Sequence, residues 1–118
     1  MEAIKLTKRQ SVISEGIKHL NENFANHDLK IGDASSKCFI SEAYFRKIFN
    51  EVYGISPIKY LNKLRLENAG KMLETGSYKV NEVYKKCGYV DACRFSREFK
   101  KHYKVSPSNY KKQSSLDM

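Results

Sequence analysis

Several residue types are scarce in this 118-residue chain, and their scarcity excludes some classes of protein. The chain has no tryptophan, two prolines and three cysteines, and the odd number and wide spacing of the cysteines argue against a disulfide framework. No apolar run approaches the roughly 20 residues that span a bilayer. The first ten residues, MEAIKLTKRQ, lack the apolar stretch of a signal peptide. The sequence therefore predicts a soluble, cytoplasmic protein without a membrane partner.

Side chains for catalysis or metal binding are also few. No pair of histidines or cysteines has the spacing of zinc ligands, so we expect no metal site. No acid/base or nucleophile arrangement is present, so we expect neither an enzyme nor a cofactor. Apolar neighbours at helical spacing predict buried or half-buried reduced thiols, as in a reducing cytoplasm, for Cys38, Cys87 and Cys93.

Acidic residues are few beside basic ones. The chain has 22 Lys and Arg against 13 Asp and Glu, a formal net charge of +9. This balance indicates an anionic partner, which charge alone leaves open between DNA, RNA, an acidic protein and a membrane surface. The charge is uneven, with a net of +1 over residues 1–54 and +8 over residues 55–118.

Apolar residues recur at helical spacing along the whole chain, and no segment alternates like a strand. We expect a first helix over about residues 9–24, a short second helix over 31–38, and a third that follows Ser41 and closes at Gly54. Pro57 opens a long helix that ends near Thr75, with inward positions Leu61, Leu64, Asn68, Ala69, Met72 and Leu73. A short fifth helix and a sixth follow, marked by Val80, Val83, Tyr84 and Cys87, and by Phe95, Phe99 and His102. Pro107 opens a last turn.

An internal repeat is visible in this pattern. Phe45, Phe49, Tyr53, Ser56, Pro57 and Tyr60 recur 50 residues later as Phe95, Phe99, Tyr103, Ser106, Pro107 and Tyr110. The sequence predicts an all-α fold of about seven helices, in which a long linker helix joins two lobes. We place these parts at residues 1–56 (first lobe), 57–75 (linker helix), 76–112 (second lobe) and 113–118 (disordered tail).

A short helix, a tight turn and a longer helix form a helix-turn-helix unit, whose second helix enters the major groove of DNA. Packing occupies one face of each second helix, and the opposite face is left to contact DNA. In the first unit these residues are Glu42, Ala43, Arg46, Lys47 and Asn50. In the second unit they are Ala92, Cys93, Ser96, Arg97, Lys100 and Lys101. Each face begins with small residues and offers a basic residue one turn later, which suits base reading by arginine.

The same residues carry a family resemblance, strongest in FRKIFNEVYGISPIKYLNKLRLENA and GYVDACRFSREFKKHYKVSPSNYKK. The stretch from about residue 29 to 112 resembles the AraC/XylS family of transcription regulators. The resemblance implies a recognition helix in each of two successive major grooves of double-stranded DNA, and RNA polymerase as a further partner. The base-reading residues that it implies are Ala43, Arg46, Lys47, Ala92, Cys93, Ser96 and Arg97.

The chain departs from the family pattern in its first turn, where Phe39 replaces the usual glycine. Gly32 and Gly70 also stand inside expected helices. Ala43, Ala92 and Cys93 lack the polar groups for bidentate base contacts, which shifts weight to phosphates and DNA shape. No segment of the sequence corresponds to the effector, dimerisation or phosphoacceptor domain of family members. An RNA-binding or ribosomal protein is the main alternative, although RNA binding does not require the repeat.

Overall fold

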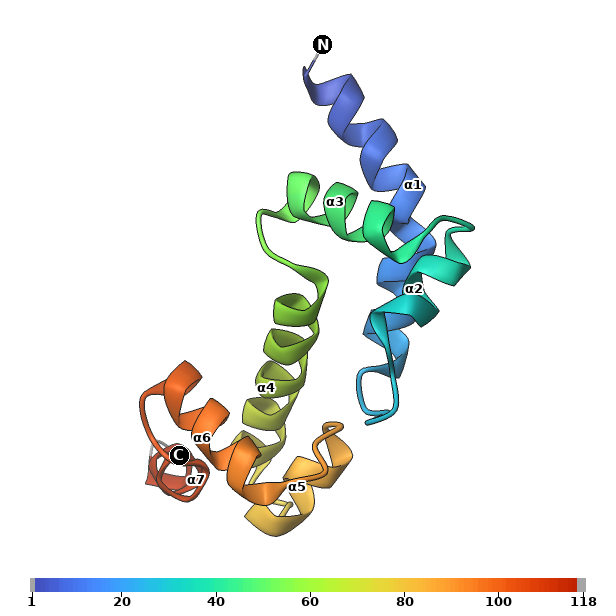
Figure 1. Ribbon diagram of the computed structural model, residues 1–118. Coiled ribbons are helices and arrows are strands. Elements are labelled where there is room, and N and C mark those ends of the chain that lie inside the picture. Colours follow the sequence, from blue (N-terminus) through green and yellow to red (C-terminus); the bar gives the residue numbers. More distant parts are fainter. Residues whose placement is uncertain (1, 117–118) are drawn as a thin grey trace. The chain divides into compact units, whose positions relative to one another are not determined.

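The computed structural model describes residues 2–116, and the side chains of residues 8–114. Within them the chain forms helices only, as expected (Figure 1). The helices are α1 (Glu2–Asn23), α2 (Ile31–Lys37), α3 (Glu42–Tyr53), α4 (Pro57–Thr75), α5 (Val80–Lys86), α6 (Ala92–Tyr103) and α7 (Pro107–Leu116).

The chain divides into two compact units, each containing one helix-turn-helix pair. The first unit comprises the residues up to 23 together with 28–62, and the second comprises 24–27 together with the residues from 63 onward. The helix α4 is continuous, and its residues are shared between the units instead of forming a separate linker segment. The short segment 24–27 belongs to the second unit although the first lobe was expected to contain it.

Local sequence signals set the ends of the helices in both repeats. The Ser41 side chain accepts a hydrogen bond from the Tyr44 backbone N–H at 3.1 Å, so Ser41 is the N-cap of α3. Ser56 and Ser106 accept in the same way from residues 59 and 109 at the starts of α4 and α7. Both α3 and α6 end at a left-handed residue, Gly54 at φ 74° and Lys104 at φ 69°.

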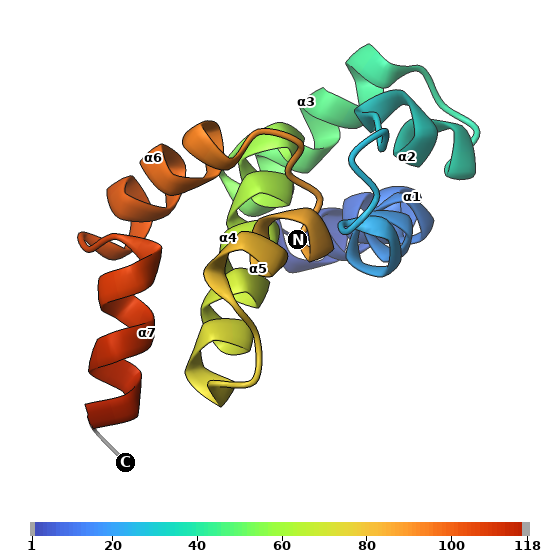
Figure 2. The same cartoon turned by 90° about the horizontal axis from the view of Figure 1, so that it is seen from below.

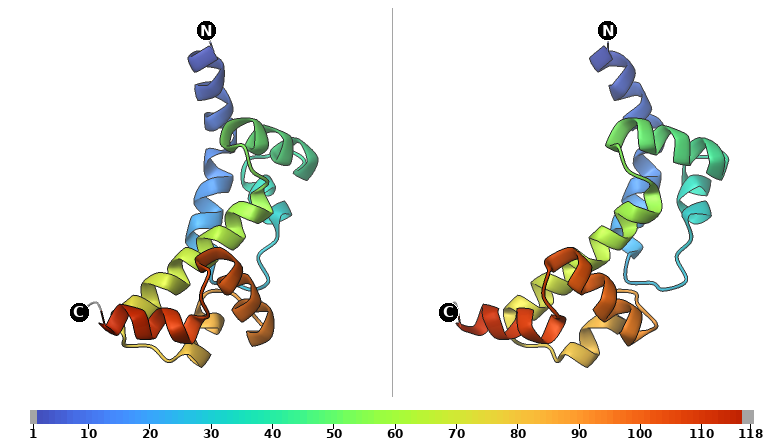
Figure 3. Two further views of the ribbon diagram at one scale, coloured as in Figure 1. Left: turned by 90° about the vertical axis from the view of Figure 1, so that its left-hand side faces the viewer. Right: turned by 60° about the vertical axis from the view of Figure 1, so that its left-hand side comes forward.

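In the first unit α1 packs against α2 and α3 (Figure 3). A glycine permits the close approach, because a Cβ at Gly16 would lie 2.6 Å from Cε2 of Phe45 and 2.8 Å from the Ala34 carbonyl oxygen. The core residues are Ile13, Leu20, Ile31, Ala34, Phe45, Ile48, Phe49 and Leu61. Burial of this apolar surface holds α2 and α3 against α1.

In the second unit α6 packs against α5 and α7 (Figure 2). Aromatic residues of α6 are prominent in the core. The ring of Phe99 stacks on Tyr103 at 4.4 Å and meets Tyr110 edge-on at 5.4 Å between ring centroids. The buried cluster contains Leu66, Ala69, Leu73, Val83, Cys87, Tyr89, Phe95 and Phe99. These ring contacts therefore fix which face of α6 points outward.

Several expectations about helix ends and inward faces were wrong. Helix α1 begins at Glu2, earlier than expected, and α7 extends to Leu116. Residues 113–116 are therefore helical and not a disordered tail, while residues 117 and 118 lie outside the described residues. His102 is exposed, and its neighbour Tyr103 packs inward instead. Tyr103 takes the inward position because its ring packs against that of Phe99 in the core.

The inward face of α4 also differs from expectation in the middle of the helix. Leu64 and Asn68 are only half-buried, whereas Leu66 and Arg65 are buried. Nε of Arg65 donates to the Phe24 carbonyl oxygen at 2.8 Å, and an Nη donates to that of Asn26 at 3.0 Å. Burial lowers the pKa of Arg65. The guanidinium thus ties α4 to segment 24–27, a role that apolar periodicity does not indicate.

Candidate nucleic-acid interface

Helix α3 has one buried face and one exposed face. Phe45, Ile48 and Phe49 are buried in the first unit. All five residues expected to contact DNA from this helix are exposed: Glu42, Ala43, Arg46, Lys47 and Asn50. The Arg46 guanidinium lies 3.7 Å from the Glu42 carboxylate, one turn earlier on the same face. Both side chains are about half exposed, so this pair restrains Arg46 only weakly.

Helix α6 repeats this arrangement with more positive charge. Phe95 and Phe99 are buried, and the expected contact residues are all exposed: Ala92, Cys93, Ser96, Arg97, Lys100 and Lys101. Asp91 is the N-cap, and its carboxylate accepts from the backbone N–H groups of Cys93 and Arg94 at 2.8 and 3.4 Å. The exposed face of α6 therefore begins at a capped helix start.

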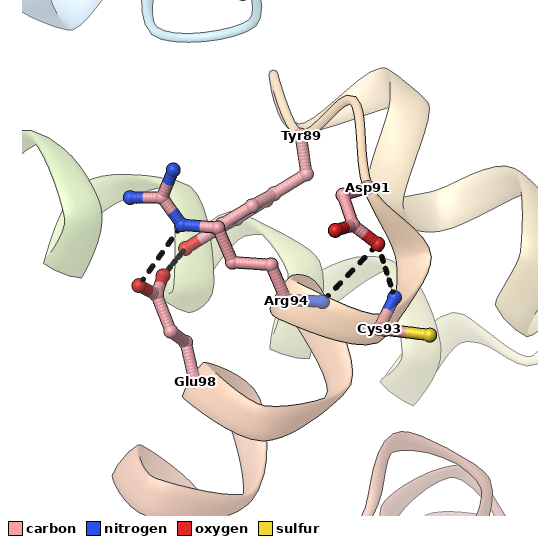
Figure 4. Close-up of polar contacts among 5 residues, drawn as sticks. All are labelled: Tyr89, Asp91, Cys93, Arg94 and Glu98. Carbon is pink, nitrogen blue, oxygen red and sulfur yellow. Dashed lines mark hydrogen bonds and ion pairs between the residues drawn. The ribbon is translucent and has the colours of Figure 1, made fainter.

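A polar network that the sequence analysis missed lies beside this face (Figure 4). Nε of Arg94 donates to Oε1 of Glu98 at 3.3 Å, and the Tyr89 hydroxyl donates to Oε2 of the same carboxylate at 3.0 Å. The i,i+4 spacing of Arg94 and Glu98 was a signal that could have found this ion pair. The contribution of Tyr89 had no such signal, because a tyrosine beside a turn predicts packing alone.

The two units differ in charge. The second unit has 13 Lys and Arg against six Asp and Glu, a net of +7, whereas the first has nine against seven, a net of +2. Positive potential attracts an anionic polymer and raises its rate of association. The second unit should therefore supply most of the attraction to phosphates.

In each of the turns before α3 and α6, one residue has a left-handed backbone conformation. That residue is exposed in the first turn and buried in the second. Phe39 has φ 58°, a left-handed conformation that costs a non-glycine residue energy, and its side chain is 94% exposed. Gly88, which follows Cys87 as Phe39 follows Cys38, has φ 91° and is buried. A Cβ at Gly88 would overlap the Phe24 carbonyl oxygen and lie 2.7 Å from Nε of Arg65. The family pattern of glycine is thus required sterically only in the second turn.

The cysteines occupy three different environments. Cys87 is buried, and burial raises the pKa of its thiol to about 11. Cys38 is half-buried, and burial raises its pKa as well. Cys93 is exposed, so the expectation of burial was wrong for it, because it lies on the face of α6 opposite the phenylalanines. All three are free thiols.

No cluster of three or more His, Cys, Asp and Glu side chains suited to a metal ion occurs among the described residues. In the same part of the chain no helix combines the length and apolar character that crossing a membrane demands.

A family profile described as a helix-turn-helix domain matches residues 34–113, from the middle of α2 to α7. The chain belongs to the AraC/XylS family. It resembles the lactose operon transcription activator of Staphylococcus xylosus, with 28% identity over 110 residues, 90% of this chain and 39% of that protein. The chain thus spans about two fifths of such a relative.

Solved structures agree with this assignment to the AraC/XylS family. The C-terminal domain of AraT, a response regulator from Geobacillus stearothermophilus, has a TM-score of 0.81 and 26% identity, covering 86% of this chain and 84% of that one. The DNA-binding domain of AdpA, solved with a target DNA, has a TM-score of 0.83 over 89% and 94% of the two chains, with 22% identity. The AdpA likeness shows a common fold. The chain is an AraC-type DNA-binding domain with two helix-turn-helix units.

Proposed function

We propose that the chain binds double-stranded DNA sequence-specifically, with α3 and α6 in two successive major grooves, and thereby regulates transcription. The observation that supports this is the repeated exposed face on the second helix of each pair, opposite buried phenylalanines. An enzyme has little use for such a duplication, whereas two similar reading helices double the length of site recognised.

The proposed roles follow from chemistry and position. Arg46 and Arg97 read bases, because a guanidinium binds guanine O6 and N7 bidentately. The lysines and Asn50 contact phosphates or flanking bases. The Ser96 hydroxyl hydrogen-bonds to a phosphate or to a base edge. Ala43, Ala92 and Cys93 contribute apolar contact and let the helix ends approach closely. Glu42 lies beside Arg46 on the same face and restrains it weakly. The set in the first unit is Glu42, Ala43, Arg46, Lys47 and Asn50, and in the second Ala92, Cys93, Ser96, Arg97, Lys100 and Lys101.

The proposal extends to the setting of this activity. A transcription regulator works in the bacterial cytoplasm, contacts RNA polymerase, and catalyses no reaction itself. The relatives are longer than this chain, and we assign the sensing of a controlling signal to the parts of such proteins that it does not span. Activation and repression are both compatible with the domain.

The deciding experiment is selection of bound duplexes from a random pool. We expect one asymmetric preferred site with two contacted patches about 10 base pairs apart, since the two helix pairs follow one another in the sequence as a direct repeat. Unlabelled duplex of that sequence should displace a bound probe better than structured RNA does. Equal displacement by RNA, or a pool without an enriched sequence, would contradict sequence-specific DNA binding.

A further inference from the structure

The carboxylate of Glu98 connects a buried tyrosine to an exposed arginine at the start of α6. One of its oxygens accepts from the Tyr89 hydroxyl at 3.0 Å, and the other accepts from Nε of Arg94 at 3.3 Å. The side chain of Glu98 is 27% exposed and that of Arg94 is 58% exposed. The hydrogen-bonded network of Tyr89, Glu98 and Arg94 therefore runs from the core of the second unit to its surface.

The tyrosine end of this network is rigid. Tyr89 is 6% exposed, and its ring meets that of Phe95 edge-on at 5.2 Å between centroids. Burial raises the pKa of the phenol, and the hydrogen bond to Glu98 raises it further. The hydroxyl therefore stays protonated and continues to donate to Glu98. A carboxylate held in this way at one oxygen presents the other in a defined direction.

The arginine end is held by only part of its donor set. Nε makes the contact with Glu98, and the two terminal nitrogens are turned away from the carboxylate in Figure 4. Among the described residues, no hydrogen bond or ion pair of Arg94 uses these terminal nitrogens. Two parallel N–H groups match two acceptor atoms side by side, such as the oxygens of a phosphate or O6 and N7 of guanine.

We propose that Arg94 contacts DNA through its terminal nitrogens, with Glu98 and Tyr89 as positioning residues that hold its guanidinium ready. This rests on the proposed function. A free arginine loses rotamer freedom when it binds, and a side chain already held loses less, so prior positioning favours the bound state. The partner is a pair of adjacent acceptors on the DNA, either a phosphate or a guanine edge.

The proposal reverses the sign expected from charge alone. Removing a carboxylate near DNA should tighten binding, since like charges repel. If Glu98 holds Arg94 in place, its removal should weaken binding instead. Glu82 is a suitable control, because it is an exposed carboxylate on α5 of the same unit and lies outside this network.

The experiment measures dissociation constants of Arg94→Ala, Glu98→Ala, Tyr89→Phe and Glu82→Ala on the selected duplex and on random duplex, over a series of salt concentrations. We expect Arg94→Ala and Glu98→Ala each to weaken binding to the selected duplex about tenfold, and Tyr89→Phe about threefold. The double variant Arg94→Ala with Glu98→Ala should be no weaker than Arg94→Ala alone, because Glu98 acts through Arg94. Glu82→Ala should bind equally well or slightly more tightly.

Two further measurements identify the acceptor. A phosphate partner predicts equal loss on both duplexes and a log–log salt slope flatter by about 0.9 for Arg94→Ala. A guanine partner predicts loss on the selected duplex only, and one guanine position at which 7-deazaguanine weakens binding of the unchanged protein but not of Arg94→Ala. Either pattern supports the proposal, and weakening with neither pattern overturns it.

Thermal melting shows whether the variants remain folded. Arg94 is exposed and Glu98 is half-buried, so both positions should tolerate alanine. If Glu98→Ala tightens binding as Glu82→Ala does, the positioning role is wrong. If Glu98→Ala melts normally and binds like the unchanged protein, the proposal is also overturned. Absence of duplex binding by the unchanged protein would instead contradict the proposed function.

Discussion

The hydroxyl of Tyr103 lies directly against the backbone of Gly70, where any side chain would obstruct it. A Cβ at Gly70 would overlap that oxygen and lie 2.8 Å from Cζ of the same ring. The hydroxyl donates to the Leu66 carbonyl oxygen at 3.0 Å. The end of α6 therefore packs against α4 in the space left by the missing side chain of Gly70. A glycine in the interior of a helix is unfavourable locally, and this contact accounts for its presence.

Replacing Gly70 with alanine should therefore destabilise the protein. Alanine improves helix propensity by up to about 1 kcal/mol, but forcing Tyr103 out of its place costs about 1–3 kcal/mol. The measurement is urea denaturation followed by circular dichroism. Gly32→Ala is the matched control, since a Cβ there meets only Oε1 of Glu42 at 3.4 Å, and it should stabilise. Equal effects of the two substitutions would contradict the steric account.

Phe39→Gly should stabilise the first unit by about 0.5–1 kcal/mol. Its left-handed backbone costs a non-glycine residue about 1–2 kcal/mol, and the greater freedom of glycine in the unfolded chain offsets part of the gain. Little packing is removed, because the side chain is almost fully exposed. Gly88→Ala provides the contrast and should destabilise, since its Cβ would collide with the Phe24 carbonyl. Denaturation midpoints of both variants check the pair of predictions.

Salt dependence should expose the charge difference between the units. Replacing Lys100 and Lys101 with glutamine should flatten the log–log slope of affinity against salt by up to about 1.8, at about 0.9 for each phosphate that is no longer neutralised. Replacing Lys30 and Lys37, the N-cap and the last residue of α2, should flatten it less. Both pairs are exposed, so folding should be unaffected. Equal slopes for the two double variants would show that both units neutralise phosphates alike.

Arg97→Ala should act on sequence preference. We expect a loss of about 1–3 kcal/mol on the selected duplex and little change on random duplex. Arg46→Ala should show a smaller difference between the two duplexes, because Glu42 lies 3.7 Å away and partly occupies the guanidinium. Titrations of each variant against both duplexes provide the comparison. Equal losses on both duplexes would mean that the arginine concerned contacts phosphates.

Spacing of the two DNA patches should be strictly limited. Both units lie in one chain, and α4 is a continuous helix of 19 residues that contains residues of each. Inserting five base pairs between the patches turns one of them to the opposite side of the duplex, since a full turn is about 10 base pairs. Affinity should fall to that of a single unit, and a footprint should retain one patch. Unchanged affinity with two protected patches would exclude a fixed spacing.

Periodicity and capping residues predicted most of the fold. The bounds of α4 and the N-cap role of Ser41 follow from residues within one turn of each other, which is why sequence alone could supply them. The exposed faces of α3 and α6 follow from the positions of the buried phenylalanines in the same way. The repeat strengthened these predictions because each copy supported the other.

The features that the sequence analysis misplaced or missed depend on contacts that a helical period does not encode. Tyr103 faces inward because of rings on α6 and α7, and a helical period alone could not choose it over His102. The charged network at Glu98 needs Tyr89 from the preceding turn, and Arg65 needs carbonyls about 40 residues earlier. Such pairings arise only in the folded chain.

The hold of Arg65 on segment 24–27 has a consequence for the order in which the chain folds. The guanidinium of Arg65 donates to a carbonyl 41 residues earlier, and Gly88 packs against that same carbonyl. During synthesis, the ribosome completes segment 24–27 long before the last three helices emerge. A fragment beginning at Lys63 would contain those helices and lack the backbone that caps the buried guanidinium. The second half of the protein therefore packs onto a segment of the first half that is already synthesised, and it loses these contacts when the two halves are separated.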